Sequence, residues 1–316
     1  MNDIVLLLLA YSTMIFAVSL LGGKLSAIVT LTHTRTHLVM SFVAGFLLGV
    51  AMYHLLLHSL EDIPGPHAGE IAVGCVVLGV IMMIVLLRFF RFHQHEFGQD
   101  PVQVSDHDGR HDHPDSHDHP DPHDHPGHQG QPDQHGHQAA TVVNPRSVFG
   151  VATGLGLHTI TEGIALGASM RMGLIHDEGA VLVGLGVLLA IMLHKPLDAY
   201  SIIGLMRVSG YANRTCTLTN FGFALLCPLI TVLTFFGVGL LSHFNELHVV
   251  GYVMAFAAGV FLCIALSDLL PEIQFHSHDR GILALVFLIG VGLAYALFHF
   301  ESETLHGLET LDNHNH

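Results

Sequence analysis

Charged residues are scarce in this chain of 316 residues, of which 12% are Asp, Glu, Lys or Arg. Lys and Arg together number 11 and the formal net charge is −15, which argues against a nucleic-acid partner. The sequence has no CxxC pair, so its four scattered cysteines predict no disulfide framework and are interpreted as packing residues. No Walker-type GxxxxGK loop and no HExxH motif occurs, which argues against nucleotide-driven transport and a zincin-type catalytic centre.

Long apolar stretches dominate instead. The chain is 51% hydrophobic with a mean hydropathy of +0.54, which is typical of a polytopic membrane protein. A helical span needs about 20 residues. The sequence therefore predicts an all-α integral membrane protein with eight transmembrane helices, at about 4–30, 38–60, 70–92, 146–170, 178–206, 217–241, 250–273 and 280–300. The first stretch is interpreted as a true span, because Met1, Asn2 and Asp3 provide no basic signal-peptide start.

The spans divide the chain into five segments. Residues 1–92 hold spans one to three, 93–145 a cytoplasmic loop, 146–208 spans four and five, 209–300 spans six to eight, and 301–316 an extracytoplasmic tail. Lys and Arg predict this orientation, because cytoplasmic loops are enriched in them. Arg171 alone falls on the outer side and Lys195 lies inside span five. The other nine fall on the predicted cytoplasmic side: Lys24, Arg35, Arg88, Arg91, Arg110, Arg146, Arg207, Arg214 and Arg280. We expect the host to be the cell membrane, plasma or inner.

An internal repeat relates spans two and seven. Residues 42–58 read FVAGFLLGVAMYHLLLH and residues 256–272 read FAAGVFLCIALSDLLPE, with seven identities at an offset of 214. Five helix steps separate the two spans, so they cross in opposite directions. This predicts an inverted 3+2+3 repeat, a common plan of transporters, in which spans one to three match spans six to eight. Chance similarity between apolar segments is the alternative.

Polar residues follow both repeated segments, and we expect them to form the two mouths of a cation path. The outer group is His54, His58, Glu61 and Asp62, and the inner group is Asp268, Glu272, His276 and His278.

The loop 93–145 is a low-complexity segment with twelve His and ten Asp or Glu. It has almost nothing apolar to bury, so we expect disorder. Tandem imidazoles bind divalent metals loosely, which favours metal buffering or sensing over a merely solvated spacer. The densest run contains His111, His113, His117, His119, His123 and His125.

Two pairs of ionisable residues lie near the middle of spans four and five. His158 with Glu162, and His194 with Asp198, are each spaced i, i+4 and so share a helix face. Ionisable groups at membrane depth cost roughly 2.5–3.5 kcal/mol each on insertion scales, so they indicate function. Two imidazoles and two carboxylates suit one divalent transition metal. Either pair alone could be a structural hydrogen bond.

These motifs carry a family resemblance. The run His158-Thr159-Ile160-Thr161-Glu162-Gly163 resembles the HNxPEG motif in span four of the ZIP (Zrt/Irt-like) divalent metal transporters. The run from His194 to Asp198 is similar to their span-five motif, and the eight spans and His-rich loop fit the family plan. The resemblance implies transport of zinc, or of iron, manganese or cadmium, toward the cytoplasm by alternating access, often as a homodimer. It implies His158, Glu162, His194 and Asp198 as the metal site.

The sequence departs from the family pattern at three positions that tune the site. Thr159 and Lys195 stand where many members carry an amide and a second ligand, and Thr161 replaces a proline. We therefore expect one transported metal rather than two, with Lys195 in place of a second cation, as in a subset of the family. With Lys195 charged, the empty site carries −1, and a bound dication makes it +1. We expect the metal to be a substrate and no cofactor to be bound. The expected partners are divalent metal ions and membrane lipid.

Two other functions fit parts of the sequence. A metal efflux carrier of the cation-diffusion type also uses HxxxD pairs, but it has six spans and a folded cytoplasmic domain, whereas only 16 residues follow span eight here. An intramembrane metallohydrolase would need three ligands, an open metal position and a general base. We expect no enzyme and no catalytic residue.

Overall fold

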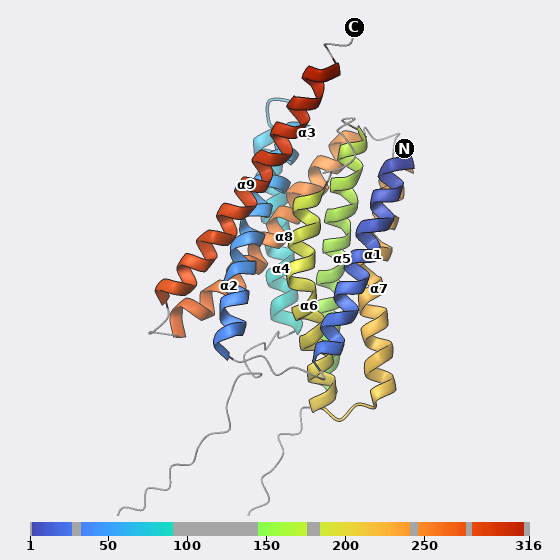
Figure 1. The fold of residues 1–316 in the computed structure, drawn as a ribbon, viewed down its shortest axis with the longest axis vertical. Coiled ribbons are helices and arrows are strands. Elements are labelled where there is room, and N and C mark those ends of the chain that lie inside the picture. Colours follow the sequence, from blue (N-terminus) through green and yellow to red (C-terminus); the bar gives the residue numbers. More distant parts are fainter. Residues whose placement is uncertain are drawn as a thin grey trace, which may run out of the picture. The chain divides into compact units, whose positions relative to one another are not determined.

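The computed structural model describes residues 2–26, 33–90, 145–175, 184–240, 246–275 and 280–312, and all regular structure in these ranges is helical (Figure 1). Residues 93–144 of the predicted His-rich loop, and His276 and His278 of the predicted inner mouth, lie outside them. The helices in chain order are α1 (Asn2–Leu25), α2 (His33–Gly49), the π-helix η1 (Val50–Leu56), α3 (Leu57–Asp62), α4 (Ala68–Phe90), α5 (Pro145–Ile175), α6 (Leu185–Val208), α7 (Asn213–Leu240), α8 (Glu246–Phe275) and α9 (Arg280–Asp312).

The predicted all-α integral membrane fold is confirmed, with seven of the eight predicted spans found among the described residues as helices that could cross a membrane. The helices α2, η1 and α3 form one continuous rod, because Gly49 and Leu57 keep right-handed helical backbone angles. That rod and six other helices in the described ranges are long and apolar enough to cross a membrane. The eighth, α5, has 31 residues but is less apolar than the others, because it contains glycines, threonines and the polar side chains of His158 and Glu162.

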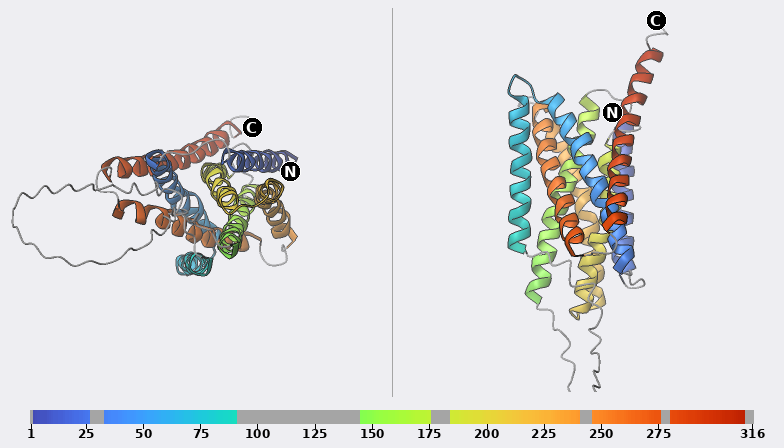
Figure 2. Two further views of the ribbon diagram at one scale, coloured as in Figure 1. Left: turned by 90° about the horizontal axis from the view of Figure 1, so that it is seen from below. Right: turned by 90° about the vertical axis from the view of Figure 1, so that its left-hand side faces the viewer.

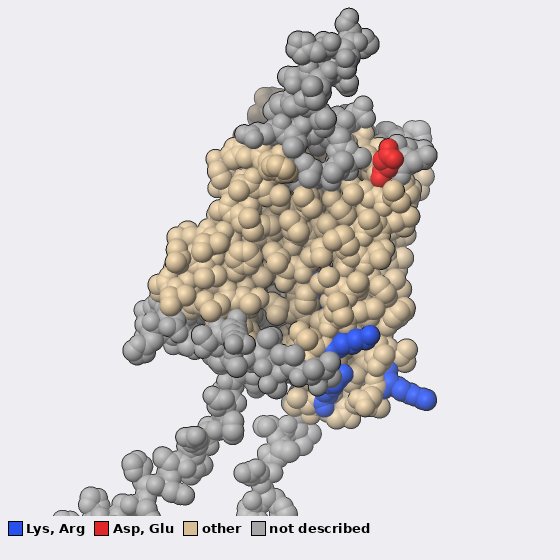
Figure 3. Space-filling view, viewed as in Figure 1, with Lys and Arg blue, Asp and Glu red and all other residues tan. Residues whose placement is uncertain are grey.

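Many large apolar side chains of the helices face outward, whereas two charged side chains lie fully inside. Leu218 is 72% exposed and Leu6 69% exposed, whereas Glu162 and Lys195 are fully buried. This is the arrangement expected in lipid, where a helix satisfies its own backbone groups and the outer surface meets hydrocarbon. Figure 3 shows that the charged side chains of one face gather at its two ends.

The helices pack as two groups (Figure 2). The first, which we call the site bundle, comprises α1, α5, α6 and α7, with α5 along α7 and α1 along both α6 and α7. The second, the support bundle, comprises the α2–η1–α3 rod, α4, α8 and α9, with α2 along α9 and α4 along α8. The bundles meet mainly where α5 lies against α8 and α4.

Glycines bring helices of the support bundle into backbone contact in a reciprocal way. A Cβ on Gly45 of α2 would overlap the carbonyl oxygen of Phe287 on α9, and a Cβ on Gly259 of α8 would overlap that of Val76 on α4. In return, a Cβ on Gly290 of α9 would overlap the carbonyl oxygen of residue 42, and one on Gly79 of α4 that of residue 256. The residues of one interface correspond to those of the other at constant sequence separations. Residues 45 and 259, and 42 and 256, are 214 positions apart, while residues 76 and 287, and 79 and 290, are 211 positions apart.

The start of α1 and the end of α9 lie at the same end of the helices, which we call the terminal side (Figure 1). The opposite end, where α4 ends and α5 begins, is the loop side. Lys24, Arg88, Arg207 and Arg214 are exposed at helix ends on the loop side. Arg171 lies near the terminal end of α5, half-buried over the ring of Phe235.

Candidate metal site

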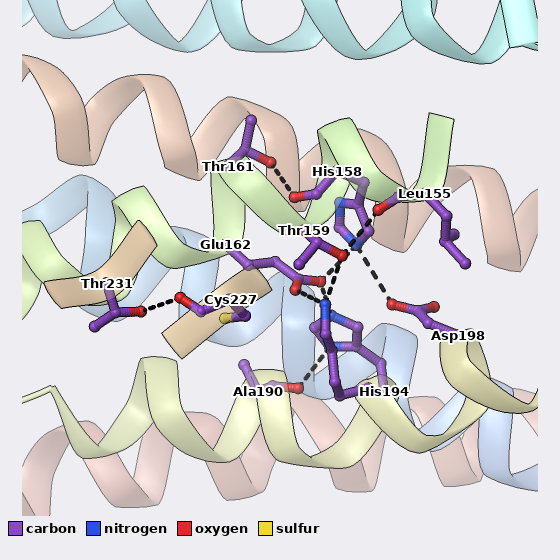
Figure 4. A network of polar contacts seen from close by, with 11 residues as sticks. Leu155, His158, Thr159, Thr161, Glu162, Ala190, His194, Asp198, Cys227 and Thr231 are labelled. Carbon is purple, nitrogen blue, oxygen red and sulfur yellow. Dashed lines mark hydrogen bonds and ion pairs between the residues drawn. The ribbon is translucent and has the colours of Figure 1, made fainter. Parts of the chain in front are cut away.

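The four predicted ligands converge inside the site bundle. His158 and Glu162 project from α5, and His194 and Asp198 from α6, because each pair is one turn apart on its helix. One ligand atom from each lies within 4.8 Å of those of the others, and all four residues are buried (Figure 4). No second group of this kind occurs in the part of the chain that the structure describes.

The carboxylate of Glu162 contacts three other side chains of the site. Its Oε1 lies 2.7 Å from Nε2 of His158 and 2.5 Å from Nε2 of His194, so one oxygen faces both imidazoles. Its Oε2 lies 2.5 Å from Nζ of Lys195. The carboxylate of Asp198 stands further off, 3.9 Å from Nε2 of His158.

Three groups within the site bundle surround the ammonium of Lys195. Its Nζ donates to Oγ1 of Thr159 at 2.7 Å, and that hydroxyl in turn donates to the carbonyl of Leu155 at 2.8 Å. The ammonium also lies 4.7 Å from the ring centroid of Phe223 on α7, within the range of a cation–π interaction. A carboxylate, a hydroxyl and an aromatic face therefore compensate the loss of hydration of this fully buried cation.

The ring of His194 is oriented by its own helix. Its Nδ1 lies 2.6 Å from the carbonyl oxygen of Ala190, one turn earlier, so Nδ1–H donates there and Nε2 points at the shared centre. On α5, Thr161 donates to the carbonyl of His158 at 2.7 Å. Nδ1 of His158 is buried without a hydrogen-bond partner among the described residues.

The donor set fits a divalent transition metal as substrate. Tetrahedral zinc at about 2.0–2.1 Å from nitrogen or oxygen places its ligand atoms roughly 3.3 Å apart. The contacts of 2.5 and 2.7 Å at Oε1 would open by less than 1 Å, and the contact of 3.9 Å to Asp198 would shorten by a similar amount. The most widely separated ligand atoms lie within 4.8 Å of each other, so side-chain shifts of about 1.5 Å or less convert the present hydrogen-bonded arrangement into a four-ligand cage.

The predicted mouth residues lie apart from this centre. His54 is buried in η1 with Nε2 3.3 Å from the carbonyl oxygen of Ala294. His58 pairs with Glu61 at 3.5 Å, and Glu61 is exposed. Asp268 and Glu272 lie on α8, but the structure does not describe their side chains. The inner mouth therefore stays a prediction.

Three contacts of the site were missing from the sequence prediction. Phe223 covers Lys195, the Ala190 carbonyl orients His194, and Phe261 of α8 packs edge-on against His194 with ring centroids 6.4 Å apart. The Ala190 contact follows from i, i−4 spacing and could have been read from the sequence. The two phenylalanines come from other helices and carry no local signal.

Known proteins similar to this chain are zinc transporters. Zinc transporter ZIP9-B of Xenopus laevis is 32% identical over 133 residues, which cover 41% of this chain and 42% of that relative. Zinc transporter ZIP9 of Micropogonias undulatus is 33% identical over 130 residues, 40% of each chain. Zinc transporter foi of Drosophila melanogaster is 26% identical over 172 residues, 52% of this chain and 22% of the relative. The matches thus span less than half of these relatives.

The model of one family matches almost the whole chain. It is described as "ZIP Zinc transporter" and aligns with residues 5–298. Members of that family are transporters rather than enzymes, and neither the cation-diffusion carrier nor the metallohydrolase finds support. On this match, the chain belongs to the ZIP family of zinc transporters.

Proposed function

We propose that this protein carries a divalent transition metal, zinc first with iron and manganese as alternatives, across the membrane toward the cytoplasm. The observation that carries the proposal is the buried group of His158, Glu162, His194 and Asp198, whose ligand atoms lie within 4.8 Å of one another. Two nitrogen and two oxygen donors suit zinc and are accepted by neighbouring metals. The similarity to zinc transporters supports zinc.

The site transports one metal ion rather than two. Lys195 occupies the position beside Glu162 where a second cation would have to bind, and its Nζ is 2.5 Å from Oε2. An ammonium there repels an incoming dication and competes for Glu162. Counting only Glu162, Asp198 and Lys195 as charged and both imidazoles as neutral, the empty site carries −1 and the loaded site +1, so metal retention is weaker than in a site with two unpaired carboxylates.

Transport proceeds by alternating access, in which the site bundle moves against the support bundle. All four ligands and Lys195 belong to α5 and α6, so the metal cage can travel intact. Asp198, at the loop side of the cage, is the most exposed of the four ligands at 8%. That exposure supports release toward the loop side.

The loop side faces the cytoplasm and both termini face outward. Exposed basic residues at the loop-side helix ends support this orientation, because Lys and Arg are enriched on cytoplasmic faces. The His-rich loop 93–145 buffers metal there, His54, His58 and Glu61 belong to the outer mouth, and a homodimer is the expected assembly.

The fold is an inverted repeat. The reciprocal glycine contacts support it, since the α2–α9 and α8–α4 interfaces repeat the same four positions at offsets of 214 and 211. Two unrelated apolar helix pairs would have no reason to share both the glycine positions and the backbone atoms that these glycines meet.

A flux measurement tests the function. Purified protein in liposomes should carry zinc down its gradient, and His158→Ala and Glu162→Ala should each abolish flux and weaken binding at least about a hundredfold. His67→Ala is the matched control, because His67 faces Glu70 at 3.3 Å in an exposed pair. No flux of zinc, iron or manganese under any gradient would refute the proposal, and net export from intact cells would favour the efflux carrier.

A further inference from the structure

His54 lies at the contact between the two bundles. It is 4% exposed and sits in η1 of the support bundle. A histidine at membrane depth is costly, and π-helical segments are frequent at functional sites. Its Nε2 faces the Ala294 carbonyl of α9 and its ring stands edge-on to Phe298 at 5.7 Å. These contacts fix the ring to the support bundle.

The other face of the ring meets the first turn of α6, in the site bundle. A Cβ built on Gly186 would lie 2.7–2.8 Å from Nδ1, Cε1 and Cγ of His54. Real Cβ atoms do not approach so closely, so the ring occupies space that only a glycine leaves open. Gly184, two residues earlier, has a φ of +71°, and a Cβ built on it would lie 3.2 Å from the hydroxyl oxygen of Ser169 on α5. The start of α6 therefore lies close to the support bundle at Gly186 and to α5 of its own bundle at Gly184.

This contact lies on the terminal side of the metal cage. Ser169 is seven residues beyond Glu162 on α5, and Gly186 is eight residues before His194 on α6, or roughly 10 and 12 Å along the helices. Both residues are buried. A metal entering from the terminal side must pass the level at which the His54 ring joins the bundles.

We propose that His54 is a positioning residue for transport: its ring, seated on Gly186, holds the two bundles in the state in which the site is closed toward the terminal side. The inference rests on the proposed carrier function. Opening that side requires the first turn of α6 to leave the ring. Substitutions on either side of the contact then shift the equilibrium toward the open state without changing any of the four ligands of the buried site.

Thiol accessibility at Ser169 tests this in detergent-solubilised full-length protein without metal. Ser169→Cys is nearly isosteric, and its modification by a cationic methanethiosulfonate is read by peptide mass spectrometry. We expect Gly186→Ala and His54→Ala each to speed modification at least about threefold. The double variant should be no faster than His54→Ala, because the added methyl group no longer meets a ring. Gly237→Ala, where a Cβ meets nothing within 4 Å, should leave the rate unchanged.

Native Cys216, buried near the loop-side start of α7, is the internal control for general loosening. Its modification should stay at the wild-type rate. The proposal is overturned if the rates at residue 169 match Gly237→Ala, if Cys216 speeds up in parallel, or if the two substitutions add. The assay uses no metal, so it can contradict the role of His54 while liposomes still show flux. Absence of flux with the wild-type protein would refute the transport function separately.

Discussion

Lys195 and Glu162 form the electrostatic centre of the candidate site. One carboxylate oxygen faces two imidazoles and the other faces the ammonium, so any ion that binds Glu162 must compete with three partners. Thr159 and Phe223 contact the ammonium independently of Glu162. We therefore expect Lys195 to stay in place when a metal binds, and to act as a fixed charge that lowers metal affinity and eases release.

Removing this charge should tighten binding and slow transport. In Lys195→Met, which preserves length, and in Lys195→Ala, zinc affinity should rise at least about tenfold, or about 1.4 kcal/mol, while flux falls. Isothermal titration in detergent and liposome flux measure the two quantities. Lys24→Met, at an exposed position in the last turn of α1, is the control. An unchanged zinc dissociation constant would contradict this role.

Helix pairs of the support bundle depend on glycine at matched positions. Gly45 and Gly259 let α2 and α8 touch the backbones of α9 and α4, a spacing that allows dispersion contacts in lipid where the hydrophobic effect does not draw helices together. The two interfaces place their glycines at equivalent positions. Gly45 and Gly259 should therefore contribute similar amounts to the free energy of unfolding.

Gly45→Ala and Gly259→Ala should each destabilise the protein by about 1–3 kcal/mol, because the added Cβ would overlap a backbone carbonyl that cannot rotate away. Thermal unfolding in detergent should show a lower midpoint for both. Gly222→Ala and Gly292→Ala, with open space around the new Cβ, should stay at or above the wild-type midpoint. A fall confined to one of the two interface variants would contradict their equivalence.

Across the whole molecule, every predicted metal ligand of the buried site belongs to one compact helical unit. That unit lies within residues 1–94 and 143–316. The predicted metal-buffering histidines of the loop lie outside the described residues. Metal selectivity and movement should therefore be properties of the helical unit alone, with the His-rich segment acting on metal supply.

Replacing residues 95–142 by a Gly/Ser linker of equal length should leave liposome flux within about twofold of wild type. The variant should lose the additional weak metal equivalents that its histidines supply, as counted by metal analysis after equilibrium dialysis. Scrambling the same segment, which preserves composition, should retain them. Abolished flux in the linker variant would show that the segment takes part in transport itself.

Much of this architecture could be predicted from the sequence, because the relevant physics is local. Lipid forces long apolar runs into helices, so eight spans were predictable to within several residues. The errors lie at the helix ends. The first span was predicted to end at about residue 30, whereas α1 ends at Leu25. The pairing of His158 with Glu162 follows from helical spacing alone, as does the orientation of His194 by Ala190.

The amino-acid sequence by itself determined the helices, the ligand types and the face on which each pair lies, because a helix repeats every 3.6 residues whatever surrounds it. Only the tertiary structure decided that Phe223 covers Lys195, that Glu162 shares one oxygen between two histidines, and that His54 rests on Gly186. Those contacts join residues far apart in the chain. They depend on how helices rotate and cross, which apolar periodicity leaves open when lipid and protein interior are equally apolar.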